Sequence, residues 1–155
     1  MVKVCFHETA KDELLRFAVI VSKYRGKWVF CKHKDRTTYE CPGGHREPNE
    51  PIDETAKREL WEETGALKYH MKPICPYSVQ KDGKETFGML FFAELLELGE
   101  LPPLEIEKVE LFDELPQEWT YPEIQPLLVE RIKKLSFIQG QRKLPSCVSG
   151  SDLVF

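Results

Sequence analysis

The chain has 155 residues, of which 41% are hydrophobic and 31% are charged, and its formal net charge is −4. This length suits one domain with a substantial core and is short for two. The negative charge argues against binding to a nucleic-acid duplex, which requires a basic surface. A nucleotide substrate is still compatible with it, because divalent cations can stand between acidic side chains and a polyphosphate.

The lack of recognisable targeting signals and the spacing of the cysteines narrow the possible classes of protein further. No apolar run is long enough to span a bilayer, and the N-terminal residues lack the basic and apolar regions of a secretory signal. We therefore expect a cytoplasmic protein that has no membrane partner. The five cysteines form no CxxC pair and are odd in number, which predicts buried free thiols and no disulfide framework or zinc cluster.

The first third of the chain has the pattern of short strands that lead to a sharp turn. Apolar and β-branched runs predict three strands, over residues 17–24, 28–33 and 39–41. A turn at Arg25-Gly26 is expected to join the first two strands. The third is expected to end at the Pro42-Gly43-Gly44 sequence, a strong break in regular structure.

A helix is predicted over residues 51–64, followed by further strands and a second helix. Glu50 is placed at the N-cap of the first helix, Pro51 at its first helical position, and Gly65 at its end. The remaining predicted elements are an extended segment, a turn, two strands and a helix, over residues 69–80, 81–84, 86–98, 109–112 and 122–135.

Strands before, between and after two helices indicate an α/β fold, in which helices enclose a mixed sheet. We predict a single domain over residues 1–135 and a C-terminal tail over residues 136–155, which lacks clear periodicity. Leu153, Val154 and Phe155 are the expected anchors of this tail.

Three glutamates crowd into the last turns of the first helix. On a wheel of about 100° per residue, Glu59 and Glu63 fall beside the apolar stripe of that helix and Glu62 on its flank. A solvated acidic helix would instead place its acids on the polar side. A like-charged i,i+4 pair costs about 0.2–0.5 kcal/mol on an exposed helix, and more when it is buried. A bound divalent cation would offset both the repulsion between the glutamates and the cost of burying them. Mg²⁺ fits better than zinc, because it prefers oxygen ligands.

These acids lie within a longer pattern. Five residues separate its first glycine from its first glutamate, and seven more precede an Arg-Glu-aliphatic sequence. The fixed positions are, in order, Gly44, Glu50, Arg58, Glu59, Leu60, Glu62, Glu63, Gly65 and Ala66. The pattern resembles the Nudix box, the signature of the Nudix hydrolases. The one mild departure is Ala66, which is smaller than the usual bulky aliphatic residue.

The resemblance covers about residues 15–135 and implies both a fold and a chemistry. The fold is an α/β/α sandwich around a mixed β-sheet. The chemistry is hydrolysis of a nucleoside diphosphate linked to another group, by attack of water on phosphorus, with Mg²⁺ or Mn²⁺ as the cofactor. It implies a small-molecule nucleotide partner and leaves open whether the protein is a monomer or a homodimer.

The resemblance also implies roles for individual residues. Glu59, Glu62 and Glu63 would bind the metal ions, and one of them, with Glu59 as first choice, would instead be the base that takes the proton of water. The carbonyl of Gly43 or Gly44 would be a further ligand. Arg58 would orient a carboxylate of the box, and Glu50 would support the loop or a metal ion.

One more carboxylate is expected from outside the box. The sequence PLEIEKVELF offers Glu105 and Glu107, and either one can also be an ordinary surface acid. Glu105 is our first choice, because it lies ahead of the strand predicted over residues 109–112. We therefore add it to the predicted metal ligands.

The substrate is less well defined by the sequence. Lys34 and Arg36, with Lys32 beside them, either meet phosphates or form a solvated edge, and we assign Lys34, Arg36 and Tyr39 to substrate binding. Four aromatic residues either stack on a base or belong to the core: Trp28, Phe87, Trp119 and Tyr121.

The compact chain resembles Nudix members that act on nucleoside triphosphates, including oxidised purine nucleotides, and this is the predicted substrate class. The alternatives within the fold are a dinucleotide polyphosphate, a nucleotide sugar or a capped RNA. A module that binds nucleotides without cleaving them and an isopentenyl diphosphate isomerase are the alternatives of other classes. The intact acids argue against the first, and the missing histidine metal site argues against the second.

Overall fold

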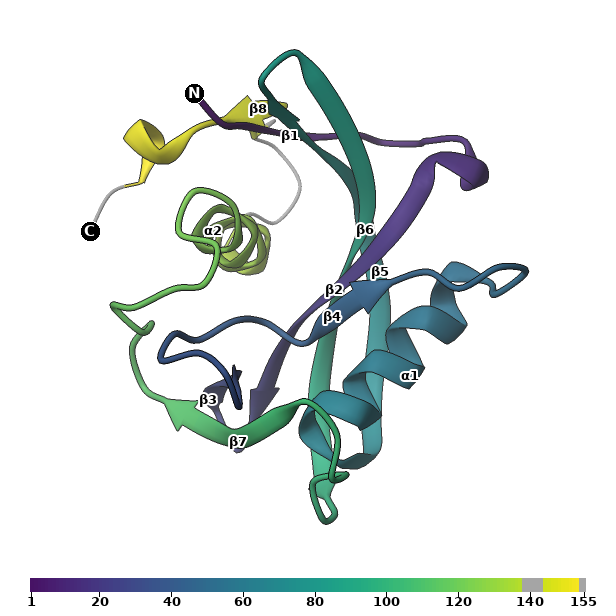
Figure 1. Ribbon diagram of the computed structural model, residues 1–155. Coiled ribbons are helices and arrows are strands. Elements are labelled where there is room, and N and C mark those ends of the chain that lie inside the picture. The colour runs from purple at the N-terminus through teal and green to yellow at the C-terminus, as the bar shows by residue number, and fades with distance from the viewer. Residues whose placement is uncertain (138–143, 154–155) are drawn as a thin grey trace.

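The computed structural model describes residues 1–137 and 144–153, which form one sheet with a helix on each side (Figure 1). The strands are β1 (Lys3–Phe6), β2 (Leu15–Tyr24), β3 (Lys27–His33), β4 (Gly43–His45), β5 (Ala66–Lys81), β6 (Lys84–Leu98), β7 (Ile106–Phe112) and β8 (Cys147–Val148). The helices are α1 (Ile52–Thr64) and α2 (Gln125–Phe137), with short 3₁₀ turns at Asp12–Leu14 and Gly150–Asp152.

The sheet is mixed, as predicted. Its strand order is β7-β3-β2-β6-β5-β1-β8, with β4 added at the side of β2. The β2–β6 pair is parallel, and the other pairs are antiparallel. Within residues 1–137 and 144–153, no helix is long and apolar enough to cross a membrane.

The sheet carries a hydrophobic core on each face, because successive side chains of a strand point to opposite faces. From β2, Ala18 and Ile20 pack with Ala56 and Leu60 of α1. Val19, which lies between them, belongs to the core on the opposite face, together with side chains of α2. Each helix therefore buries one apolar stripe against the sheet, which confirms the α/β/α arrangement.

Two tight turns between strands each consist of a residue pair whose second member is glycine. Arg25 and Gly26 have φ values of 52° and 79° and join β2 to β3, as predicted. Asp82 and Gly83, with φ values of 52° and 76°, join β5 to β6 in the same way. Two consecutive positive φ values match the right-handed twist of a hairpin, and glycine adopts them without steric cost.

The two halves of β2 have different neighbours on one edge, and this split positions the loop before α1. Ser22–Tyr24 pair with β3, whereas Phe17–Val19 pair with β4. The third strand predicted over residues 39–41 is wrong in its bounds, because Tyr39 and Glu40 form only isolated bridges and the paired strand begins at Gly43. The chain thus leaves the sheet after β3 and returns just before the helix.

Both helices begin later than predicted. The N-cap of α1 is Pro51, one residue after the predicted Glu50, whose side chain instead accepts a hydrogen bond from Thr55 Oγ1 at 2.6 Å. Gly65 ends the helix in the left-handed conformation at φ 74°, as predicted. The second helix starts at Gln125, since the preceding residues form a turn, and it continues to Phe137.

The C-terminal segment joins the sheet through β8, which pairs antiparallel to β1. In this register Cys147 lies opposite Cys5, and the two residues form a disulfide, whereas Cys31, Cys41 and Cys75 are free. The prediction of free thiols throughout is therefore wrong for one pair. Leu153 packs against the core on the α2 face, as expected of an anchor, while Val154 and Phe155 lie outside the described residues.

Candidate active site

The glutamates of α1 face the loop that precedes the helix. Glu63 is only 6% exposed, and its Oε1 accepts the backbone N–H of Gly43 at 2.7 Å. The carboxyl carbon of Glu59 lies 2.3 Å from where a Cβ on Gly44 would be, so any larger residue at this position would displace the Glu59 carboxylate. The acids therefore point toward β4 and away from solvent, as the helical wheel predicted. Trp61, on the opposite side of α1, is 47% exposed.

Arg58 ties the loop to the helix through several contacts. Its guanidinium donates to both oxygens of Glu50, with Nε at 2.8 Å from Oε2 and Nη2 at 3.0 Å from Oε1. It also donates to Oε1 of Glu59 at 2.8 Å and to the carbonyl of His45 at 3.1 Å. These hydrogen bonds from Arg58 lower the pKa of Glu50 to about 2. Arg58 thus fixes the loop and one side of the Glu59 carboxylate together.

Two of the acids lie where negative charge is disfavoured. Burial raises the pKa of Glu63 to about 8 in spite of the hydrogen bond from Gly43, and the nearby carboxylates of Glu59, Glu40 and Glu105 raise it further. Burial likewise raises the pKa of Glu59 to about 7, although Arg58 partly opposes the shift. Clustered carboxylate oxygens of this kind fit a hard divalent cation, which would compensate their charge.

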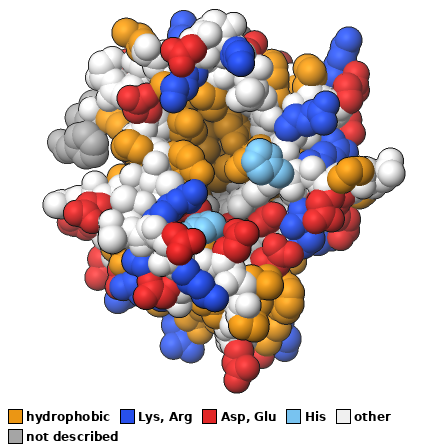
Figure 2. Space-filling model, viewed as in Figure 1, with side chains coloured by type: hydrophobic (Ala, Val, Ile, Leu, Met, Phe, Trp, Pro, Cys, Tyr) orange, Lys and Arg blue, Asp and Glu red, His pale blue; other side chains and the backbone are white. Residues whose placement is uncertain are grey.

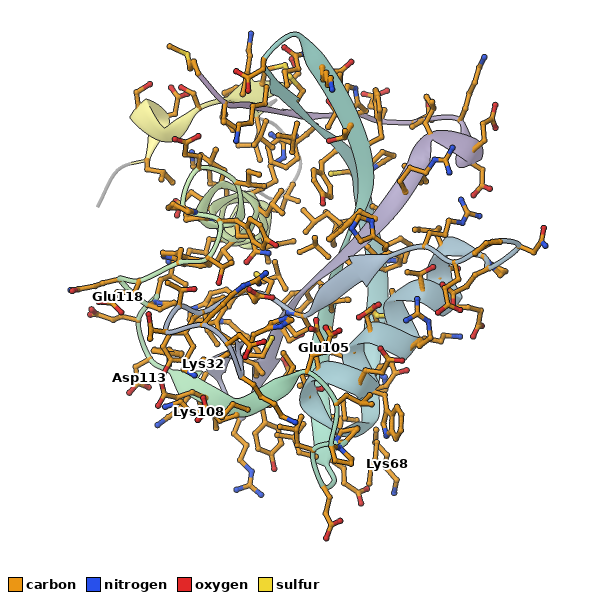
Figure 3. All side chains as sticks on the ribbon, viewed as in Figure 1. Lys32, Lys68, Glu105, Lys108, Asp113 and Glu118 are labelled. Atoms are coloured by element: carbon orange, nitrogen blue, oxygen red, sulfur yellow. A yellow bond between two sulfur atoms is a disulfide. The ribbon has the colours of Figure 1, made fainter. Side chains whose placement is uncertain are left out.

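These side chains line a polar cavity of about 630 Å³ between α1, β4 and the loop before β7. Glu105 lines this cavity, whereas Glu107 forms an ion pair with Lys32. Figure 3 shows Glu105 on the side toward α1 and β4, while Lys32 and Lys108 lie toward β3 and β7. Of the two acids outside the box, Glu105 is therefore the one that the fold brings to Glu59 and Glu63.

The sequence analysis missed a second charged cluster in this cavity. Nε2 of His33 lies 2.9 Å from Glu40 and 3.6 Å from Glu63, and Arg36 contacts the other oxygen of Glu40 at 2.9 Å. The ligand atoms of His33, Glu40 and Glu63 lie within 4.8 Å of one another, a spacing that can also hold a metal ion. The only sequence signal was the position of Glu40 directly before the Cys41-Pro42 turn.

A second, apolar cavity of about 540 Å³ adjoins the polar one. It is lined mainly by aromatic and aliphatic side chains of β2, β5, β6 and the turn before α2, namely Phe17, Val19, Tyr77, Val79, Phe87, Tyr121 and Ile124. Phe17, His45, Tyr121 and Gln125 line both cavities, so the two lie side by side. Figure 2 shows a hollow lined by hydrophobic side chains beside a group of acidic ones.

Of the remaining predicted substrate residues, one lines a cavity and two do not. Arg36 lines the polar cavity, whereas Lys34 and Tyr39 are not among its lining residues. The backbone N–H of Lys34 donates to the Glu105 carbonyl at 3.0 Å, and the Tyr39 ring packs edge-on against Phe112.

Of the four aromatic candidates for base stacking, two line a cavity and two pack in or against the core. Phe87 and Tyr121 line the apolar cavity, and Tyr121 also lines the polar one. Trp28 is a member of the core on the α2 face, and Trp119 packs against the same core, where it contacts Phe30.

Comparisons with known proteins agree with this fold and site. Residues 13–132 match the model of the NUDIX domain. The chain is 32% identical over 145 residues to a Bacillus subtilis (strain 168) protein named "Putative 8-oxo-dGTP diphosphatase YtkD", covering 93% of this chain and 85% of the relative. The protein is thus an enzyme of the Nudix hydrolase class, and the chain belongs to the Nudix family.

Solved structures give the same result for the fold. The pyrophosphohydrolase BsRppH of Bacillus subtilis, in a mutant form, superposes with a TM-score of 0.70 at 27% identity, covering 89% of this chain and 93% of that one. A NUDIX hydrolase from Nitrosomonas europaea gives a TM-score of 0.64 at 18% identity, covering 82% and 97%. Nudix hydrolases use divalent metal ions, and the donor set of the polar cavity is consistent with this property.

Proposed function

We propose that the protein hydrolyses nucleoside triphosphates, including oxidised purine nucleotides, to a nucleoside monophosphate and pyrophosphate. The observation that carries this proposal is that the two cavities adjoin and share Phe17, His45, Tyr121 and Gln125 as lining residues. A base fits an aromatic-lined cavity, and a polyphosphate with its cations fits a cavity lined by carboxylates. The name of the Bacillus subtilis relative, a putative 8-oxo-dGTP diphosphatase, supports the same substrate class.

Mg²⁺ or Mn²⁺ is the proposed cofactor. Its proposed ligands are oxygens from α1, from the loop before it and from the loop before β7: Glu62, Glu63, Glu105 and the carbonyl of Gly43 or Gly44. Bound cations of this kind neutralise phosphate charge and lower the pKa of a bound water. Glu63 is held by Gly43, and Glu59 by Arg58, so both carboxylates are fixed before substrate arrives.

Glu59 is our choice for the general base. Its carboxylate takes a proton from the attacking water, while the water oxygen bonds to phosphorus and the anhydride bond between the α- and β-phosphates breaks, which separates nucleoside monophosphate from pyrophosphate. Arg58 keeps Glu59 in place, and its hydrogen bonds to Glu50 keep the loop against the helix. Arg36, which lines the polar cavity, is the proposed phosphate contact among the predicted substrate residues.

A substrate panel tests this proposal. Nucleoside triphosphates, 8-oxo-dGTP, nucleotide sugars, dinucleotide polyphosphates and capped RNA are assayed with Mg²⁺, with Mn²⁺ and with excess chelator, and the products are identified. We expect pyrophosphate release from triphosphates that depends on the metal and is lost in Glu59→Gln. Full activity in chelator would exclude the metal mechanism, and turnover confined to another class would exclude the triphosphate proposal.

A further inference from the structure

A short 3₁₀ turn, Asp12–Leu14, forms part of the rim of the apolar cavity, and we call it the rim turn. Glu13 and Leu14 line the cavity from this turn. All three of its residues are exposed, and Leu14 is 41% exposed. The rim turn therefore gains little from the burial of its own side chains, so its position depends on polar contacts with the rest of the chain.

Arg46, which directly follows β4, supplies such contacts. Its guanidinium donates to the carbonyl of Asp12 at 2.8 Å through Nη1, and to Oδ2 of the same residue at 2.8 Å through Nη2. Nη1 also donates to the Leu15 carbonyl at 3.3 Å, at the start of β2. The Arg46 side chain is only 17% exposed. One planar guanidinium thus reaches two acceptors of the rim turn and one of the strand that follows it.

These contacts amount to more than a surface ion pair. An exposed pair contributes little by itself, and the Asp12 side chain is 69% exposed. Three acceptors of Arg46 are instead backbone carbonyls, those of Asp12, Leu15 and Glu50, and the last of these lies 2.5 Å from Nε. The backbone N–H of Arg46 also donates to the Arg16 carbonyl at 2.8 Å. Arg46 therefore fixes the backbones of two segments relative to each other.

Glu50 connects Arg46 to the polar cavity. The Glu50 carboxylate accepts two hydrogen bonds from Arg58, and Arg58 also donates to Glu59, the proposed base. Contacts between polar groups thus run without a break from the proposed base to the rim turn. They fix the phosphate side and the base side of the site relative to each other.

We infer that Arg46 is a positioning residue, which holds the rim turn against a nucleoside bound in the apolar cavity. This inference rests on the proposed function, in which the base enters that cavity. Without Arg46, the rim turn can move away, and the nucleoside loses its contacts with Glu13 and Leu14. The carboxylates of the polar cavity keep their own supports, from Arg58 and from the N–H of Gly43. Loss of Arg46 should therefore weaken binding of the nucleoside part of a substrate and spare the phosphate part.

Hydrogen exchange, followed by NMR without any ligand, tests whether Arg46 holds the rim turn. Arg46→Lys keeps the charge, but a single ammonium cannot reach the acceptors of Asp12 and Glu50 together. The amides of Leu14 and Leu15 are hydrogen-bonded within the rim turn, and they should exchange about tenfold faster in this variant. Amides of α1 should stay within about twofold. Unchanged exchange at Leu14 and Leu15 would overturn the inference.

Calorimetry with two ligands, each in the presence of Mg²⁺, separates the two sides of the site. The first ligand is dGMP, which carries a nucleoside, and the second is inorganic pyrophosphate, which does not. We expect Arg46→Lys to raise the Kd of dGMP about tenfold and to leave that of pyrophosphate within about twofold. An equal loss for both ligands, or an unchanged Kd of dGMP, would overturn the inference. Arg25→Lys, at an exposed position between β2 and β3, is the matched control and should change neither constant.

Asp12→Ala is a second variant, which keeps the test valid if Arg46→Lys folds poorly. It removes only the contact at Oδ2, because the Asp12 carbonyl remains, so the Kd of dGMP should rise less, by about threefold. A larger effect than that of Arg46→Lys would overturn the inference. If the expected binding changes are seen but the wild type releases no pyrophosphate from triphosphates, the inference holds and only the proposed reaction is overturned.

Discussion

The two cavities of the site are built on different physical principles. The polar cavity gathers carboxylates that burial and mutual repulsion make unfavourable, and its loop is held by Arg58 and by the N–H of Gly43. The apolar cavity is lined by side chains that gain from leaving water, with Gln125 as a fixed polar group. We therefore expect an added cation to stabilise the first cavity and to have no effect on the second.

The largest effect should come from removing one box carboxylate. Glu59→Gln and Glu63→Gln keep the side-chain shape and remove the charge, so turnover should fall by orders of magnitude while the fold is retained. Glu54→Gln, on the exposed side of α1 beside Lys57, is the matched control and should keep activity. Steady-state rates decide the question, since retention of more than about a tenth of the activity, about 1.4 kcal/mol in the barrier, contradicts these roles.

The next effect is on stability and concerns the same cavity. A cation that binds only the native state stabilises it by about 2.7 kcal/mol at a hundredfold excess over Kd. Mg²⁺ should therefore raise the melting temperature of the wild type, and Glu63→Gln should respond less. Melting curves are measured at constant ionic strength. Identical responses would mean that the acids are merely a charged surface, which salt screens in both proteins alike.

The apolar cavity should respond differently. Phe87→Ala removes an aromatic wall, and loss of stacking on a base costs about 1–3 kcal/mol. We expect KM to rise about ten- to a hundredfold with a smaller change in kcat, the reverse of the pattern for Glu59→Gln. Leu96→Ala, at an exposed apolar position, is the control. A drop in kcat alone would show that the base does not occupy this cavity.

A further effect is a pH dependence of the metal-free protein. The pKa of Glu63 is raised to about 8 in the folded state, against an ordinary value of 4.5 in the unfolded chain. The folded state thus holds a proton that the unfolded state has lost, so stability should decline as pH rises from about 5 to 8. In chelator, the melting temperature should fall less steeply over this range for Glu63→Gln. Equal slopes of melting temperature against pH in the two proteins would mean that groups other than Glu63 cause the dependence.

The polar cavity was predictable because its signals are local. The spacing of the glutamates along one helix, the glycines of the loop and the stop at Gly65 are all contiguous in the sequence, and the structure places them as expected. The N-cap was misplaced by one residue, because Glu50 is used by Arg58 and Thr55 and does not cap the helix.

The apolar cavity was not predictable, because its residues meet only through the strand order. Phe17 and Phe87 come from β2 and β6, whose parallel pairing has no local sequence signal. The Cys5–Cys147 disulfide was missed for the same reason, since the pairing of β1 with β8 brings together opposite ends of the chain. An odd cysteine count says nothing about which pairs the fold makes adjacent.

The shared lining of the two cavities has a consequence for inhibition. A neutral planar compound that fills the aromatic-lined cavity would contact Phe17 and Tyr121, which also line the polar cavity, and would block the substrate without carrying any phosphate. Such a compound has no charge for a cation to offset. Its potency should therefore be independent of Mg²⁺, whereas a pyrophosphate-based inhibitor should lose potency when the metal is removed.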